Sequence, residues 1–129
     1  MRLTMEADYA LRIVHCLAKN GRRMDAKSIA EQSDVTLRFS LKILRKLAGA
    51  GLLRSYKGTQ GGYELAKPLD QLSLYDVIST VEGEYQLSRC LAEGYCCSCE
   101  KPCKFQQVFG EISRDVRKKL ESYTFADFV

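Results

Sequence analysis

Long apolar runs and a secretory leader are both missing from this sequence of 129 residues. No stretch approaches the roughly 18 apolar residues that a membrane-spanning helix needs. Residues 1–8 also lack the apolar segment and the small-residue cleavage site of a secretory signal. We therefore expect a protein that resides in the cytoplasm and has no membrane partner.

Positive charge exceeds negative charge only slightly, but the excess is unevenly distributed along the chain. The net charge is +4, yet residues 1–70 hold 13 Lys and Arg against 7 Asp and Glu, whereas residues 71–129 hold 7 against 9. Between residues 36 and 67, seven basic residues stand against a single acidic one, Glu64. Such a concentration is typical of a surface that contacts nucleic-acid phosphates, although a solvated basic surface has the same composition.

Histidine is scarce, and cysteine is absent from most of the chain. The one histidine, His15, and the isolated Cys16 both lie beside apolar neighbours, so we expect structural roles for both. The other cysteines fall within fourteen residues: Cys90, Cys96, Cys97, Cys99 and Cys103. In a reducing compartment, packed cysteines indicate metal ligands or redox-active thiols rather than structural disulfides.

The first half of the chain has the hydrophobic period of three helices. Residues 5–19 place apolar side chains three and four positions apart. A short helix over residues 25–33 and a third that begins near Thr36 are separated only by residues 34–35. Two short helices joined by so tight a turn, with Arg and Lys on the outward side of the second, indicate a helix-turn-helix.

A glycine-rich hairpin is expected next. Residues 52–56 and 63–66 are short enough to be paired strands, and the connection over residues 57–62 contains three glycines. Glycine permits the positive φ angles of a tight turn and a close approach of the backbone to a surface, so we interpret the hairpin as a wing. A phosphate-binding loop is the alternative, but the Walker spacing is missing and no helix begins directly after these glycines.

The chain ends in a long amphipathic helix. Ser73 and Asp76 predict a capped helix that ends at Gly83, and residues 84–103 have no apolar period and are expected to be irregular. The final helix has apolar residues at spacings of three and four over nearly five turns: Phe105, Val108, Phe109, Ile112, Val116, Leu120 and Tyr123. We expect this stripe to pack on a second copy of the chain across a two-fold axis, with packing on its own N-terminal domain as the alternative.

Together these elements predict a mainly α fold, a winged helix-turn-helix with a small two-stranded antiparallel wing and a long C-terminal dimerisation helix. We expect a DNA-binding domain over residues 1–83, a cysteine-rich sensor segment over residues 84–103, and a dimerisation helix with a tail over residues 104–129. An enzyme is not expected. The spacing Cys96-x-x-Cys99 occurs in thiol–disulfide enzymes, but the βαβ unit that normally carries it is not readable here.

Four segments, in this order along the chain, match a known pattern. They are Leu3-Thr4 with Asp8-Tyr9-Ala10-Leu11-Arg12, residues 41–47 running into 51–53, the wing residues 57–66, and a cysteine segment that leads into a dimer helix. In these segments the chain resembles the Rrf-type (IscR/NsrR/CymR-like) family of winged helix-turn-helix transcriptional regulators. The resemblance implies a homodimeric, sequence-specific regulator that acts as a repressor. Lys57, where the family usually has Arg, and Ser40, where it often has Leu, affect which DNA sequence is read rather than the fold.

The third helix supplies the residues expected to read bases. In a helix-turn-helix the first residues of this helix face base edges in the major groove: Thr36, Arg38, Phe39, Ser40 and Lys42. Arg38 can pair bidentately with guanine, which is worth about 1–3 kcal/mol of discrimination. The residues expected at phosphates are Arg45, Arg54 and Lys67. The resemblance implies that the wing residues Lys57, Thr59 and Gln60 enter the minor groove. The alternatives are core packing for Phe39 and a solvated helix face for Lys42.

A cluster site is implied by the resemblance. Members that carry an iron–sulfur cluster have three cysteines with five residues between each pair, and here both Cys90 to Cys96 and Cys97 to Cys103 fit that gap. Cys90 and Cys103 are therefore ligand candidates in either register, Cys96 or Cys97 is the middle ligand, and Cys99 is a spare. The cluster type, two-iron or four-iron, stays open.

The fourth ligand is not fixed by these cysteines. In cluster-assembly members it is a histidine three residues after the last cysteine, where this chain has Gln106, so we do not expect that position to ligate. In nitric-oxide-sensing members an acidic residue of the first helix takes the role across the dimer, and Asp8 stands at the matching place. The alternatives for Asp8 are a solvated acid at a helix start and replacement by another cysteine. A structural zinc site, a thiol switch without metal, and control by a regulatory protein partner also stay open.

Overall fold

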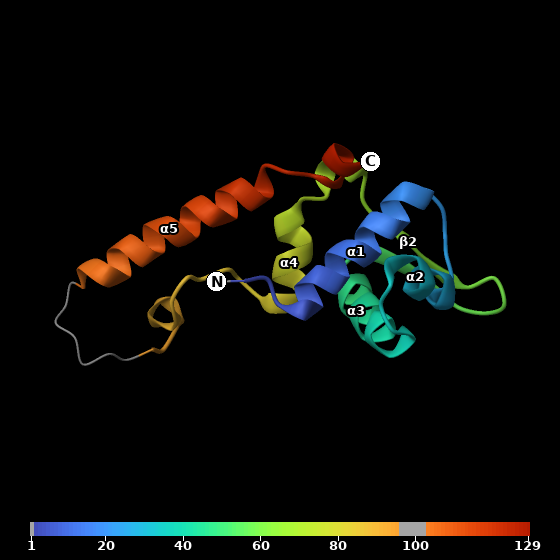
Figure 1. Ribbon diagram of the computed structural model, residues 1–129, viewed down its shortest axis with the longest axis horizontal. Helices are drawn as coiled ribbons and strands as arrows, with labels where there is room; N and C mark the ends of the chain where they lie inside the picture. Colours follow the sequence, from blue (N-terminus) through green and yellow to red (C-terminus); the bar gives the residue numbers. More distant parts are fainter. Residues whose placement is uncertain (1, 96–102) are drawn as a thin grey trace.

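The computed structural model describes residues 2–95 and 103–129, and Figure 1 shows their arrangement. The first half contains the helices α1 (Met5–Asn20), α2 (Ala26–Ser33) and α3 (Leu37–Gly49) and the antiparallel strands β1 (Leu53–Tyr56) and β2 (Gly62–Leu65). The second half contains α4 (Leu74–Glu82), α5 (Lys104–Glu121) and the short 3₁₀ helices η1 (Leu69–Gln71), η2 (Arg89–Leu91) and η3 (Phe125–Phe128). The predicted mainly α fold with a two-stranded wing and a long C-terminal helix is confirmed. Within the described ranges, no helix has the length and apolar character that a membrane crossing requires.

Side-chain caps set the starts of the helices. Thr4, Asp25 and Thr36 each accept a hydrogen bond from a backbone N–H in the first turn of α1, α2 and α3, respectively. Ser73 and Asp76 form the predicted capping box at the start of α4. These caps satisfy N–H groups that have no partner within the helix, which is why the helices begin close to the positions that the sequence indicates.

One hydrophobic core joins the helices to the base of the wing. Ile13 of α1, Leu44 of α3 and Val77 of α4 are fully buried in it. Leu53, the first residue of β1, is also buried there and pairs with Leu65 of β2. The base of the wing is therefore part of the core. The face of α3 that does not pack on the core is exposed to solvent.

The chain after α5 returns to the helical body. Figure 1 shows α5 projecting from the body, with its first residues farthest away and its last residues leading back to the body, where the C-terminus lies. Phe125 is only 2% exposed, and its backbone N–H donates to Leu72 O at 3.0 Å. The expectation that Tyr123 extends the apolar stripe of the last helix is wrong, because α5 ends at Glu121 and Tyr123 O accepts a hydrogen bond from Leu74 N.

Candidate nucleic-acid interface and cysteine segment

The outward face of α3 combines basic and aromatic side chains. Arg38, Phe39, Lys42 and Arg45 are exposed to solvent. Thr36 is exposed as well, and its Oγ1 accepts the backbone N–H of Phe39 at 3.3 Å, so its side chain is occupied in capping the helix. Core packing, the alternative for Phe39, does not occur, since its side chain is 48% exposed. This face offers charged, hydrogen-bonding and apolar groups to a ligand along one helix.

The position of Ser40 does not fit its predicted role as a base-reading residue. Its side chain is fully buried (0% exposed), and its Oγ has no hydrogen-bond partner among the described residues. A hydroxyl in the core cannot reach a base edge without a rearrangement of α3. The helical period explains the error, because Ser40 lies on the same face as the buried Ile43, Leu44 and Leu47.

The wing is a two-stranded hairpin whose tip is open to solvent. The register pairs Arg54 with Glu64 and Tyr56 with Gly62 across the strands. The side chains expected to contact DNA are all exposed: Arg54, Lys57, Thr59, Gln60 and Lys67. An isolated hairpin of this length has little stability of its own, so its position depends on what supports it.

Residues just before α2 provide that support, and sequence reasoning did not single them out. The guanidinium of Arg23 lies 3.4 Å from the centroid of the Tyr56 ring, and its Nη1 donates to Gln60 O at 3.3 Å. Met24 and Tyr63 form an isolated antiparallel bridge with N–O distances of 2.9 and 2.8 Å. Gly62 makes this approach feasible: a Cβ there would lie 2.4 Å from Met24 O.

Two carboxylates neutralise parts of the basic surface. Glu6 Oε1 lies 2.6 Å from Lys46 Nζ and 3.9 Å from Lys42 Nζ. On the wing, Glu64 Oε1 lies 3.8 Å from Arg54 Nη1. These ion pairs are partly exposed, so they contribute little to stability, and the cations can exchange a carboxylate for another anion at low cost.

The structure describes two of the five clustered cysteines. Cys90, in η2, and Cys103, directly before α5, are free and half-buried, while Cys96, Cys97 and Cys99 lie outside the described residues. Gln106 connects the two ends of the segment, because its Nε2 donates to Cys90 O at 2.9 Å. Among the described residues no three His, Cys, Asp or Glu side chains are grouped for a metal ion.

Two further contacts fix the start of the irregular segment on α5. The hydroxyl of Ser113, which is buried, accepts the backbone N–H of Leu87 at 2.9 Å. Arg117 Nη1 donates to Tyr85 O at 2.6 Å and lies 3.5 Å from Glu84 Oε1. One side of α5 therefore packs on its own chain through polar contacts.

The other side of α5 carries the predicted apolar stripe. Phe105 is 73%, Val108 48% and Ile112 37% exposed, whereas Phe109, Val116 and Leu120 are half-buried. A helix that packed only on its own domain would bury this stripe. Three exposed apolar side chains along one helix form a surface on which another molecule can pack.

The acidic and imidazole side chains of α1 have partners on their own chain. Asp8 Oδ2 lies 2.9 Å from Arg12 Nη2, and both side chains are nearly half exposed. His15 Nε2 lies 3.1 Å from Phe128 O. A carbonyl oxygen only accepts, so this nitrogen is the donor in the contact, which ties α1 to the C-terminal tail.

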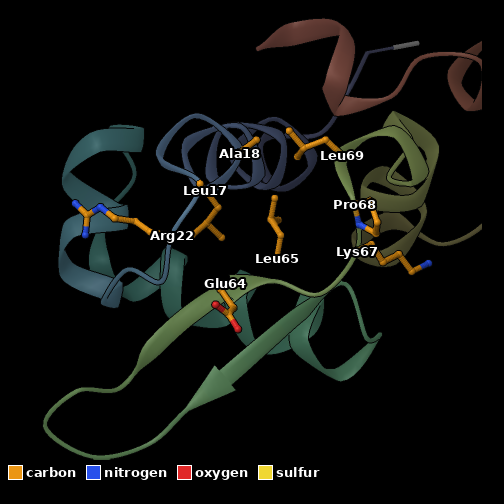
Figure 2. Close-up of a pocket in the computed structure, with 9 residues that line it drawn as sticks. Leu17, Ala18, Arg22, Glu64, Leu65, Lys67, Pro68 and Leu69 are labelled. Carbon is orange, nitrogen blue, oxygen red and sulfur yellow. The ribbon is translucent and has the colours of Figure 1, made fainter.

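A shallow hollow lies behind the wing, between the end of α1 and the chain that follows β2 (Figure 2). It measures about 230 Å³, and Leu17, Leu65 and Leu69 form its apolar wall. Figure 2 shows Glu64 and Lys67 at its edge, with their charged groups directed away from the leucines. The hollow therefore belongs to the packing of the wing base rather than to a polar binding site.

Comparisons with known proteins agree with this arrangement. The family model described as "Rrf2: Iron-dependent Transcriptional regulator" matches residues 3–129. The protein rrf2 of Nitratidesulfovibrio vulgaris (strain Hildenborough) is 28% identical over 131 residues, which cover 100% of this chain and 87% of that protein.

Solved structures give the same result. CymR (YrzC) of B. subtilis superposes with a TM-score of 0.78 at 26% identity and covers 99% of this chain and 95% of its own. IscR of T. potens superposes with a TM-score of 0.77 at 23% identity, covering 99% of this chain and 85% of its own, and shares the fold. The family model matches almost the full length of the chain, and the solved relatives share its winged helix-turn-helix. The chain therefore belongs to the Rrf2 family of DNA-binding transcriptional regulators.

Proposed function

We propose that this regulator is a homodimeric repressor that reads a specific DNA site with α3 and the wing, and whose DNA affinity depends on the state of its cysteine segment. The observation that carries the proposal is the solvent-facing side of α3, where Arg38, Phe39 and Lys42 are exposed next to the basic wing. A helix of this kind enters the major groove, and a hairpin beside it contacts the adjoining backbone or minor groove. The division into a DNA-binding domain (1–83), a sensor segment (84–103) and a dimerisation segment (104–129) is part of the proposal.

The exposed residues divide into two roles. Arg38, in the first turn of α3, is the base reader, because its guanidinium can pair with both acceptors of a guanine edge. Phe39 offers an apolar contact for a thymine methyl group. Arg45, Arg54 and Lys67 contact phosphates, and the wing-tip residues Lys57, Thr59 and Gln60 lie in the minor groove.

Two arginine substitutions test these roles. Arg38→Ala is expected to lower affinity for the best site by about 1–3 kcal/mol while leaving affinity for random DNA nearly unchanged. Arg54→Ala is expected to weaken binding to all sequences alike and to reduce the slope of log K against log[salt] by about one. Fluorescence anisotropy with specific and random duplexes measures both. Arg114→Ala, at an exposed arginine of α5 that lies off the apolar stripe, is the matched control, and equal losses in all three variants would contradict the assignment.

Glu6 is expected to lower the affinity of the protein for DNA. Glu6→Gln removes the carboxylate 2.6 Å from Lys46 Nζ, which frees this lysine and Lys42 for phosphates. We expect roughly two- to fivefold tighter binding at low salt, with the gain vanishing as salt screens the charges. Glu111→Gln changes the net charge equally on exposed α5 and serves as the control. Weaker binding by Glu6→Gln than by Glu111→Gln would refute this role.

The cysteine segment fits a metal-binding or redox role by its chemistry. Thiolates are the ligands that iron–sulfur clusters require, and Cys90 and Cys103 are both free. Both lie at the start of α5, because Cys103 directly precedes this helix and Gln106 donates to Cys90 O. Gln106 donates to a backbone carbonyl, so it acts as a positioning residue for Cys90 and not as a ligand. Cys96 or Cys97 would complete the set, with Cys99 spare and Asp8 of the other protomer as the fourth ligand. A bound cluster supplies an oxygen-sensitive crosslink between the two ends of the segment.

A switch based on thiols alone is the second candidate. The similar B. subtilis protein is described as the global cysteine regulator. Control by thiol oxidation or by a regulatory protein partner is therefore proposed as the alternative to a cluster. A structural zinc site is the third candidate. All use the same residues. The state of Cys90 and Cys103 would reach α5, and through it the dimer, because Cys103 is the residue from which α5 starts.

Anaerobic reconstitution with iron and sulfide separates these candidates. We expect the wild-type protein to become brown and take up iron, and Cys90→Ala and Cys103→Ala to lose most of it, whereas Cys16→Ala keeps it. DNA affinity should differ between loaded and metal-free protein by about 5–150-fold. A colourless protein that binds zinc indicates the structural site, and a metal-free protein whose affinity follows thiol oxidation indicates the switch. An Asp8→Ala variant with unchanged iron content excludes Asp8 as a ligand.

A further inference from the structure

Arg23 connects the segment before α2 to both sides of the wing tip. Its guanidinium carbon lies 3.4 Å from the centroid of the Tyr56 ring, at the end of β1. Its Nη1 donates to Gln60 O at 3.3 Å, in the loop that leads into β2. One side chain therefore contacts the hairpin on either side of the exposed tip residues Lys57 and Thr59.

The ring on which Arg23 lies is itself fixed. The Tyr56 hydroxyl donates to Glu64 Oε1 on the neighbouring strand at 2.5 Å, and the backbone of Tyr56 pairs with Gly62. A guanidinium is planar and stacks on an aromatic face, which the compact ammonium of lysine cannot do. The stacking therefore holds Arg23 in a defined place beside the hairpin.

The tip has few contacts of its own. Gly61 N donates to Gly58 O at 3.0 Å, which closes a turn over residues 58–61. This bond lies within the turn, so it fixes the shape of the turn but not the direction in which the turn projects. The hydrogen bond from Arg23 to Gln60 O runs from the turn to the segment before α2. That bond therefore restrains the direction of the tip.

We propose that Arg23 is a positioning residue that aims the wing tip, and that it thereby sets the preference for the base pairs beside each half-site. This rests on the proposed function, in which Lys57, Thr59 and Gln60 lie in the minor groove. That groove is only about 6 Å wide, and its width depends on the DNA sequence. A tip with a preset direction fits one groove width best, whereas a free tip adapts to several.

A direct contact with a DNA phosphate is the rival role for Arg23. A phosphate contact needs only a positive charge, which lysine also carries. Positioning needs the planar group that stacks on Tyr56 and donates to Gln60 O. Arg23→Lys therefore separates the two roles, since it keeps the charge and removes the planar group.

Backbone amide relaxation of the DNA-free protein, measured by nuclear magnetic resonance, tests the positioning itself. We expect both Arg23→Ala and Arg23→Lys to lower the order parameters of Thr59, Gln60 and Gly61 to below about 0.6, the range of a flexible loop. Arg22→Ala removes the same charge at the neighbouring exposed arginine and is the matched control, with unchanged values. Wild-type order parameters in both Arg23 variants would overturn the proposal.

Fluorescence anisotropy with two duplexes tests the effect on recognition. The duplexes share the half-sites selected by the wild-type protein and differ in having A·T or G·C pairs at the flank where the wing lies. We expect wild type and Arg22→Ala to prefer one duplex about fivefold or more. Arg23→Ala and Arg23→Lys should reduce this ratio to below about twofold. Tyr56→Leu should act similarly, and adding it to Arg23→Ala should cause little further loss, because the two residues act together.

The results separate this inference from the proposed function. A flank preference in wild type that both Arg23 variants keep overturns the inference alone. The rival phosphate contact replaces it if Arg23→Lys behaves as wild type while Arg23→Ala reduces the slope of log K against log[salt] by about one. If wild type binds its half-sites without any flank preference, the minor-groove role of the wing in the proposed function is refuted, and the inferred role of Arg23 in specificity fails with it.

Discussion

Replacing Gly62 with alanine is expected to remove specific DNA binding while leaving the helical body folded. Gly62 has a φ angle of 150°, and an added Cβ would lie 2.4 Å from Met24 O and 2.8 Å from Met24 C. Both are backbone atoms, which cannot rotate away. The bridge between Met24 and Tyr63 must therefore open, and the wing loses its attachment to the residues before α2.

The loss should be large because the wing positions several cations at once. If the minor-groove and phosphate contacts of Lys57 and Arg54 are lost together, affinity falls by about a hundredfold or more, and the salt slope decreases by about two. Anisotropy measures the affinity, and circular dichroism checks the helices. Gly49→Ala is the control, since a Cβ at Gly49 meets nothing within 4 Å. Wild-type affinity for Gly62→Ala would show that the wing plays no part in binding.

Replacing Ile112 with aspartate is expected to convert the dimer to a monomer. Ile112 lies in the middle of the stripe, between Val108 and Val116, and a carboxylate buried there against a second copy of α5 has no cation to pair with in an apolar interface. Because the protomers would then bind half-sites separately, affinity for the full site should fall by at least about a hundredfold.

Sedimentation at micromolar concentration measures the change in mass. Gln107→Asp is the control: it adds the same charge to α5, but Gln107 is exposed and roughly opposite the centre of the stripe. We expect Gln107→Asp to remain dimeric. An Ile112→Asp variant with unchanged dimer mass would contradict the role of α5 and leave the alternative in which the stripe binds another partner.

Local signals in the sequence were sufficient for the elements of the fold. Thr36 and Ser73 cap helices where the hydrophobic period begins, and the glycines of the wing mark the hairpin. Such signals act within a few residues, so they survive in any tertiary context that keeps the helix or turn. Ser40 shows their limit, since a polar residue next to basic ones was assigned to the surface although its helical position faces the core.

Contacts between distant parts of the chain could not be predicted from the sequence. Arg23 packs on Tyr56, Glu6 on Lys46, and the tail residue Phe125 on the body, and no periodicity connects these positions. For the cysteines, spacing and resemblance identified Cys90 and Cys103 as candidates, but the hydrogen bond from Gln106 that connects their segment to α5 is visible only in three dimensions.

The most direct test of the account is the binding of the purified protein to a library of genomic fragments at low salt, followed by a salt titration on the fragment selected. The account predicts a pseudo-palindromic site with half-sites one helical turn, about 10 bp, or a multiple of it apart, two protomers bound per site, and a log K that falls linearly with log[salt]. Failure to bind any fragment at low salt, or binding by a single protomer without sequence preference, would contradict it.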